Sequence, residues 1–174
     1  MARNVEIKAR VDSVDAIAPY AARLAHAAPV EIDQDDTFFH CGRGRLKLRK
    51  FADDDGELIF YRREDTAGPK PSFYLRSPTT APDTMRESLA LACGLAGRVR
   101  KRRTLYLAGR TRIHLDRVEG LGEFVELEVV LGDDEPDEAG VAEAHALMAR
   151  LGIEPEQLVE GAYVDLLRAA AQQA

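Results

Sequence analysis

The sequence predicts an α+β fold in which an antiparallel sheet closes into a barrel, with helices packed against its outside. Seven or eight segments alternate charged and apolar residues with a period of two, the pattern of strands that bury one face. The connections between them are short, which favours antiparallel neighbours. Closure turns the charged faces into a lumen, where opposite charges or a ligand can neutralise them. The alternative is an open sheet with its charged faces in water and one shared apolar core.

The composition describes a highly charged chain. Its 174 residues are expected to form one domain, residues 1–174, and 31 % of them are charged, for a net charge of −6. Cys41 and Cys93 give neither metal-ligand spacing nor a disulfide framework, which favours a reducing compartment. The N-terminus lacks the apolar stretch of a signal peptide, and no segment reaches the roughly 20 apolar residues of a membrane helix. We therefore expect a cytoplasmic protein that does not bind a membrane.

In the first half of the chain, the patterns predict five strands and one helix. Residues 3–11 place Asn4, Glu6 and Lys8 on one face of a strand, with apolar residues on the other. Residues 13–28 space their apolar side chains as an amphipathic helix does, although Pro19 lies inside the stretch. The remaining strands are predicted within residues 29–40, 45–51, 57–64 and 72–76, and in the third of these Leu58, Phe60 and Arg62 share one face.

In the second half, residues 83–93 form a predicted helix that ends at Gly94. Residues 98–107 form a strand whose basic half carries charges on both faces, so the pattern leaves open which of them point inward. Three further elements are predicted: a hairpin over residues 110–131, a helix over 137–151 that ends at Gly152, and one helix or two short ones over 155–171.

The polar face of the hairpin is the first candidate site. Asp116 shares a face of its strand with Arg112 and His114, while Glu126 and Glu128 share a face of the next. Three carboxylates that approach one another repel, and a divalent cation such as Mg²⁺ or Mn²⁺ removes that cost. An ordinary solvated sheet face is the alternative. His114 has no partner histidine at ligand spacing, so we expect it to contact a ligand rather than a metal.

The basic residues point to a small anionic ligand. They collect in or beside predicted strands, at residues 43–50 and 98–103, whereas acidic runs such as residues 31–36 are expected to lie in loops. Basic strands in an acidic chain favour a compact anion over a nucleic-acid backbone. A triphosphate with a bound metal ion fits these basic residues and the carboxylates of the hairpin, because Lys and Arg bind phosphate oxygens and the metal bridges phosphate and carboxylate. The glycines near Gly42 and Gly44 lack the Gly-Lys-Ser/Thr ending of a phosphate-binding loop.

Six short motifs follow one another along residues 3–168: Asn4-Val5-Glu6-Ile7-Lys8, Lys47-Leu48-Arg49, Arg62 after Leu58-x-x-Tyr61, Lys101-Arg102-Arg103, Leu115-Asp116 followed ten residues later by Glu126-Leu127-Glu128, and Ala162 to Leu167. In this order and spacing they resemble the CYTH superfamily of triphosphate tunnel enzymes. That family includes class IV adenylyl cyclases, thiamine triphosphatases and inorganic triphosphatases.

The resemblance implies an eight-stranded antiparallel triphosphate tunnel, action on triphosphates that depends on Mg²⁺ or Mn²⁺, and no organic cofactor. It implies metal ligands at Glu6, Asp116, Glu126 and Glu128, and catalytic roles for these four residues and Lys8. It implies triphosphate contacts from Lys8, Lys47, Arg49, Arg62, Lys101, Arg103 and Arg112. The first glutamate of the family is Asn4 here, and an amide oxygen reaches a metal without charge, which leaves the number of metals open.

Three functions fit these expectations. The hairpin, Arg112-x-His114-x-Asp116-x-Val118-x-Gly120-x-Gly122, looks closest to class IV adenylyl cyclases, in which the ribose 3′-hydroxyl of ATP attacks the α-phosphorus and pyrophosphate leaves. The first alternative is a triphosphatase acting on tripolyphosphate, thiamine triphosphate or a nucleoside triphosphate. The second is a non-catalytic module that binds polyphosphate or nucleotide, which the loss of a carboxylate at Asn4 keeps open. The expected partner is a small triphosphate and no nucleic acid, and a homodimer is left open.

Overall fold

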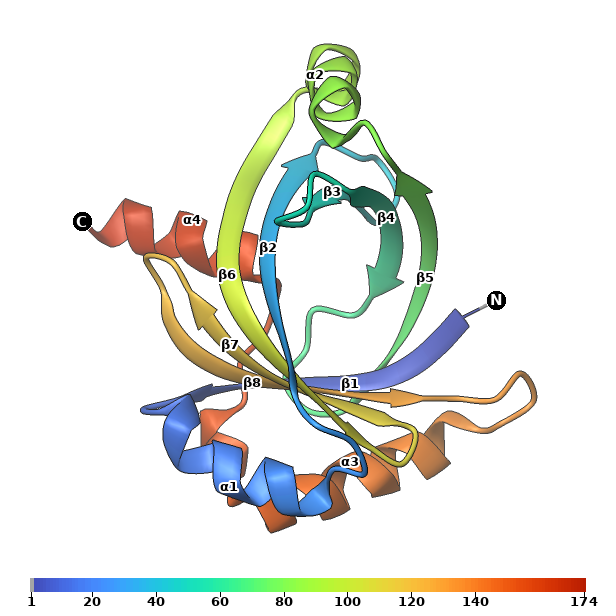
Figure 1. Cartoon of the computed structure of the whole chain (residues 1–174), viewed down its shortest axis with the longest axis vertical. Helices are drawn as coiled ribbons and strands as arrows, with labels where there is room; N and C mark the ends of the chain where they lie inside the picture. The colour runs from blue at the N-terminus through green and yellow to red at the C-terminus, as the bar shows by residue number, and fades with distance from the viewer. Residues whose placement is uncertain (1) are drawn as a thin grey trace.

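The strands of the protein form a closed ring in the computed structural model, which describes residues 2–174 (Figure 1). Met1, which the predicted domain includes, lies outside the described residues. The order around the ring is β1-β5-β4-β3-β2-β6-β7-β8, and every neighbouring pair is antiparallel. The strands are β1 (Ala2–Val11), β2 (Val30–Phe39), β3 (Arg45–Lys50), β4 (Gly56–Arg63), β5 (Lys70–Thr79), β6 (Leu95–Ala108), β7 (Thr111–Val118) and β8 (Gly122–Val130). The predicted closed antiparallel fold is confirmed.

The period-two alternation decides which side chains point into the ring. On β1, Asn4, Glu6 and Lys8 line the lumen, whereas Val5 and Ile7 point outward and are at most 1 % exposed. The outward residues join an apolar core between the strands and the helices outside the ring. Burying each such side chain stabilises the fold by about 1.5–3 kcal/mol. The larger apolar core of this protein therefore lies outside the barrel, while the lumen holds charged side chains together with a few apolar ones such as Phe38 and Val99.

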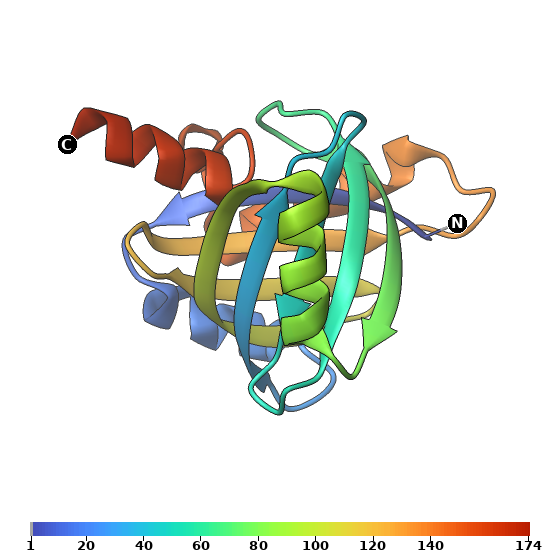
Figure 2. The same cartoon turned by 90° about the horizontal axis from the view of Figure 1, so that it is seen from above.

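Helices cover the outside of the ring, as predicted. α1 (Val14–Leu24) and α3 (Asp137–Leu151) lie under β1, β7 and β8, and α2 (Pro82–Cys93) packs along β2 and β3 (Figures 1 and 2). Gly140 on α3 allows this packing, because a Cβ there would lie 2.7 Å from a methyl group of Val5. α3 ends at Gly152, whose φ of 69° suits glycine. Among residues 2–174, none of the helices has the length and apolarity needed to span a membrane.

Several element boundaries differ from the sequence predictions. β5 and β6 are longer than expected, and the C-terminal stretch divides into a 3₁₀ turn, Pro155–Gln157, and α4 (Tyr163–Gln173). The acidic run of residues 31–36 lies in β2 and not in a loop. Cross-strand ion pairs explain this difference, since Arg98 and Arg102 on the outer face of β6 bind Asp35 and Asp33 on β2.

Candidate functional site

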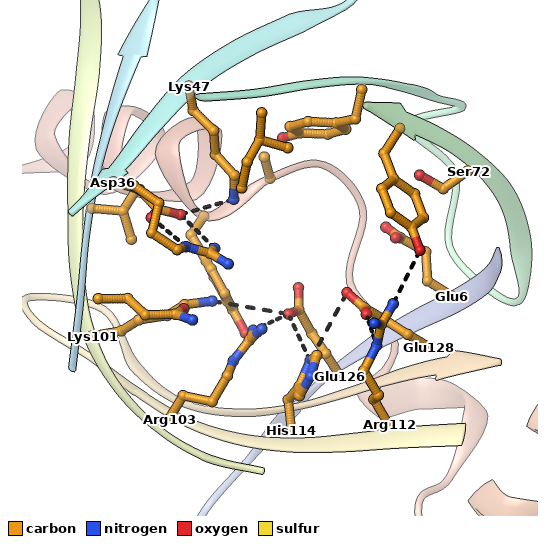
Figure 3. A pocket seen from close by; sticks show the side chains of 18 of the residues that line it. Glu6, Asp36, Lys47, Ser72, Lys101, Arg103, Arg112, His114, Glu126 and Glu128 are labelled. Carbon is orange, nitrogen blue, oxygen red and sulfur yellow. Dashed lines mark hydrogen bonds and ion pairs between the residues drawn. The ribbon is translucent and has the colours of Figure 1, made fainter. Parts of the chain in front are cut away.

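The lumen of the barrel encloses a cavity of about 270 Å³ to which all eight strands contribute side chains (Figure 3). Ala162 and Tyr163, at the start of α4, complete its lining. The charged side chains that line it are Glu6, Lys8, Asp36, Lys47, Arg49, Glu57, Arg63, Arg76, Lys101, Arg103, Arg112, Glu126 and Glu128. Every strand contributes at least one of them. The cavity is therefore surrounded by charged side chains, and more of them are basic than acidic.

Glu126 on β8 lies at the centre of this arrangement (Figure 3). Lys8 Nζ lies 3.3 Å from Glu126 Oε1, Lys101 Nζ lies 4.0 Å from Oε2, and Arg103 donates to Oε2. Burial by itself would raise the pKa of Glu126, but Lys8, Lys101 and Arg103 hold this pKa well below its usual range. Glu126 is therefore ionised and is shared by three cations.

Glu128 and His114 lie beside Glu126. Arg112 Nε donates to Glu128 at 2.9 Å, and Arg112 also reaches the hydroxyl of Tyr74 at 3.3 Å. His114 faces Glu126 across the β7–β8 ladder, and its Nδ1 lies 3.9 Å from one oxygen of Glu126 and 3.9 Å from one of Glu128. One ligand atom from each of these three residues can be chosen so that all lie within 4.8 Å of one another. His114 was expected to contact a ligand rather than a metal because no second histidine lies at ligand spacing, but its acidic neighbours come from the facing strand.

Glu6 and Lys8 connect β1 to the C-terminal segment. Glu6 is paired with Arg63 of β4, and Arg63 donates to the carbonyl oxygen of Gly161 at 2.9 Å. Lys8 Nζ donates to the same oxygen at 3.1 Å. Two cations of the lumen are thus fixed by the backbone just before α4.

A second anchor lies on the opposite wall, where Asp36 of β2 accepts hydrogen bonds from Lys47 and Arg49 of β3, all at 2.8 Å. Asp36 is buried, which would raise its pKa, but Arg49 and Lys47 lower this pKa far below the ordinary value. Sequence reasoning missed Asp36 because it was assigned to a loop.

Asp116, which was expected among the metal ligands, is not one of the residues that line the cavity. It is 0 % exposed and lies on the inner face of β7, covered by lumen side chains: Lys101 donates to it at 3.0 Å and Arg103 at 2.7 and 2.6 Å. The hydroxyl of Tyr163 also donates to it at 2.8 Å, and the ring of Tyr163 lies 4.0 Å from Lys8 Nζ. Because both carboxylate oxygens of Asp116 are occupied, this residue positions the basic side chains of the lumen.

Arg62 also lies elsewhere than the motif comparison implied. Its side chain is exposed on the outer face of β4, 5.5 Å from the ring centre of Phe73, while Arg63 points into the lumen. Side chains alternate along a strand, so only one of two consecutive arginines can point inward. Arg62 shares its strand face with the apolar residues Leu58 and Phe60, and this pattern could have shown that Arg63 is the arginine that points inward.

The other residues named from the sequence line the cavity together: Glu6, Lys8, Lys47, Arg49, Lys101, Arg103, Arg112, Glu126 and Glu128. Asn4 lies there too, 2 % exposed, and its Oδ1 has no hydrogen-bond partner among residues 2–174. On β6, Lys101 and Arg103 point inward, which resolves the ambiguity of its basic half. Besides Arg63, the lining residues Glu57, Arg76 and Tyr163 were not foreseen.

Comparison with known proteins identifies one family model and several similar structures. The CYTH domain model matches residues 2–163. A protein from Pyrococcus horikoshii has a TM-score of 0.83 at 24 % identity, covering 94 % of this chain and 99 % of that one. A protein from Vibrio parahaemolyticus, described as an adenylate cyclase candidate, has a TM-score of 0.71 at 19 % identity, covering 95 % and 97 %.

A third structure comes from Hippeastrum and is described as an adenylyl cyclase candidate with a dominant triphosphatase activity. It has a TM-score of 0.64 at 17 % identity and covers 95 % of both chains. At these identities the similarity concerns the fold. No curated protein matches the chain significantly.

Proposed function

The chain belongs to the CYTH domain family, and we propose that it is a metal-dependent enzyme that acts on a triphosphate held in the barrel lumen. The observation that carries the proposal is the lining of the lumen, where eight lysine and arginine side chains accompany five carboxylates. The surplus of positive charge suits a polyanion, and the carboxylates suit a hard divalent cation.

The ion pairs of the lumen support an exchange of partners when the ligand binds. Lys8 and Arg103 neutralise Glu126, and Arg112 neutralises Glu128. A triphosphate offers these cations acceptor oxygens of higher charge, so their side chains can turn from carboxylate to phosphate. The two glutamates are then released to hold a cation. Triphosphate and metal should therefore strengthen each other's binding.

The donor set of the lumen fits a divalent cation. Glu6, Glu126 and Glu128 would hold it with carboxylate oxygens, and Asn4 Oδ1 offers a buried neutral oxygen that lacks a hydrogen bond within the described chain. When bound, Mg²⁺ or Mn²⁺ neutralises phosphate charge and polarises the phosphorus–oxygen bonds. The basic side chains of the lumen bind and orient the phosphates: Lys8, Lys47, Arg49, Arg63, Lys101, Arg103 and Arg112. Asp116 fixes two of these groups, so the charge of the lumen is pre-organised.

Among the possible reactions, we favour hydrolysis of a compact triphosphate. A cavity of about 270 Å³ is slightly smaller than the roughly 300–1,000 Å³ of typical small-molecule sites. Hydrolysis needs phosphate contacts, a metal and water, whereas cyclisation also needs a pocket for the base and an aligned ribose hydroxyl. Adenylyl cyclase activity is the second candidate, because Ile32, Val99 and Leu105 give the same cavity an apolar part that can contact a base.

The test is to incubate the purified protein with tripolyphosphate, ATP or thiamine triphosphate, each with Mg²⁺, Mn²⁺ or a chelator, and to identify the products. We expect orthophosphate from tripolyphosphate, no product with chelator, and sharply reduced turnover for Glu126→Gln and Glu128→Gln. Glu138→Gln, on the exposed surface of α3, is the matched control and should behave as the wild type. Cyclic AMP and pyrophosphate from ATP would identify a cyclase. Binding of a triphosphate without any product would identify a non-catalytic module.

A further inference from the structure

His114 is a buried histidine with an unpaired nitrogen. It lies on the inner face of β7, is 4 % exposed, and its Nδ1 has no hydrogen-bond partner among residues 2–174. Leaving such an atom unsatisfied costs about 1–3 kcal/mol. The atoms in front of it are the carboxylate oxygens of Glu126 and Glu128 on β8 (Figure 3). A histidine in this position therefore calls for a partner that can sit between the imidazole and the two carboxylates.

The spacing of these atoms suits a shared cation better than direct hydrogen bonds. The two distances from Nδ1, both 3.9 Å, are too long for hydrogen bonds. Two ligands that each lie about 2.1 Å from one metal ion are separated by roughly 3 Å when adjacent and about 4.2 Å when opposite. The separations from His114 fall within this range, and the whole trio lies within 4.8 Å. A small movement of the side chains would complete the site.

We propose that His114 is a metal ligand and that it forms, with Glu126 and Glu128, a mixed nitrogen–oxygen site that selects Mn²⁺ over Mg²⁺. Mg²⁺ prefers oxygen ligands alone, whereas an imidazole nitrogen raises the affinity for first-row transition metals. The two carboxylates suit a hard dication and the imidazole favours a transition metal, and Mn²⁺ meets both conditions because it prefers oxygen ligands yet binds imidazole more readily than Mg²⁺ does. The proposal deepens the proposed function by naming the ion and one further ligand, and it rests on that function only for the use of the ion in catalysis.

Neighbouring cations determine when this site can fill. Arg103 and Lys8 occupy Glu126, and Arg112 occupies Glu128. Mn²⁺ must compete with them, so binding of Mn²⁺ alone is expected to be weak and to strengthen when tripolyphosphate is present and draws these side chains away. His114 Nδ1 has no hydrogen-bond partner among residues 2–174, which makes it the ligand that is available first.

The test is pulsed electron paramagnetic resonance of Mn²⁺ bound to the full chain, with and without tripolyphosphate, read for coupling to an imidazole nitrogen. The variant is His114→Gln, and the matched control is His145→Gln, which removes an exposed histidine from α3. We expect the nitrogen coupling in the wild type and the control and its loss in His114→Gln. The Mg²⁺ concentration that displaces half of the Mn²⁺ should fall about tenfold or more in that variant. His114→Asn serves as the second variant if His114→Gln does not fold, as judged by its melting curve.

Bound Mn²⁺ without nitrogen coupling in the wild type overturns the proposal, as does coupling that His145→Gln removes, or no bound Mn²⁺ in either condition. The proposed function fails separately. Nitrogen coupling without turnover of any triphosphate contradicts the proposed enzymatic function and supports His114 as a metal ligand. Metal-dependent turnover without nitrogen coupling supports the enzymatic function and contradicts His114 as a metal ligand.

Discussion

Replacing Asp116 with asparagine removes a negative charge from the most enclosed part of the barrel while keeping the size of the side chain. Asp116 is 0 % exposed and neutralises Lys101 and Arg103, which are themselves buried. An amide in its place can accept one or two of these hydrogen bonds but cannot balance the charge. The pKa of Asp116 is held below its ordinary value, because Arg103 and Lys101 outweigh the effect of burial. The carboxylate is therefore ionised and stabilising at neutral pH, and its contribution is lost only as the pH falls into the acid range below about 4.

The expected magnitude follows from this burial. Removing one partner of a buried ion pair costs about 3–5 kcal/mol. Arg103 keeps Glu126 as a second partner, so we expect the lower end of the range, about 3 kcal/mol for Asp116→Asn. In a protein of this size, 1 kcal/mol shifts the melting temperature by about 2–4 °C, which predicts a decrease of about 6–12 °C.

Thermal unfolding followed by circular dichroism at neutral pH measures this decrease, and a Mn²⁺ titration of the folded variant measures the metal site. Asp33→Asn is the control, since Asp33 pairs with Arg102 on the outside of the barrel and its side chain is 60 % exposed. It should change the unfolding free energy by less than about 1 kcal/mol. Metal affinity should stay within about twofold of the wild type in Asp116→Asn. A normal melting temperature together with a large loss of Mn²⁺ affinity would refute this reasoning and restore Asp116 to the metal ligands.

Three further predictions concern the lumen. Arg63→Gln should weaken tripolyphosphate binding, measured calorimetrically, by about 1.5–3 kcal/mol because it removes a charge-assisted contact; Arg62→Gln, on the outer face, is its control, and equal effects of the two would contradict the assignment. Burial lowers the pKa of Lys101 to about 8, so tripolyphosphate affinity should decline as the pH rises through about 8, with proton uptake on binding in that range. Lys101→Arg should abolish this pH dependence, and an unaltered pH profile of binding in this variant would contradict the assignment of the dependence to Lys101. Asn4→Asp should raise Mn²⁺ affinity, because a carboxylate attracts a dication more strongly than an amide in a desolvated lumen; an unchanged titration would show that Asn4 does not face the metal.

The sequence by itself determined the strands and the two faces of each one. Alternation between charged and apolar residues follows directly from strand geometry, so residues 3–11 already separated Glu6 and Lys8 from Val5 and Ile7. The same rule places Arg62 and Arg63 on opposite faces of β4. The motif comparison assigned Arg62 to the lumen because it did not take this alternation into account. Local signals also identified the helix ends at Gly94 and Gly152. These features depend only on residues that are near one another in the chain.

Only the tertiary structure decided which charged groups meet. Closure of the barrel pairs β1 with β8, and the ladder between β7 and β8 brings His114 opposite Glu126. Asp116 shares the inner strand face with His114, yet Tyr163 and Arg103 of β6 cover it, so it is bonded to lumen side chains and does not itself line the cavity. Such contacts join residues far apart in the sequence, and they depend on strand order, register and the curvature of the ring. No local pattern encodes those quantities, because they result from how all eight strands and the covering helices pack at once.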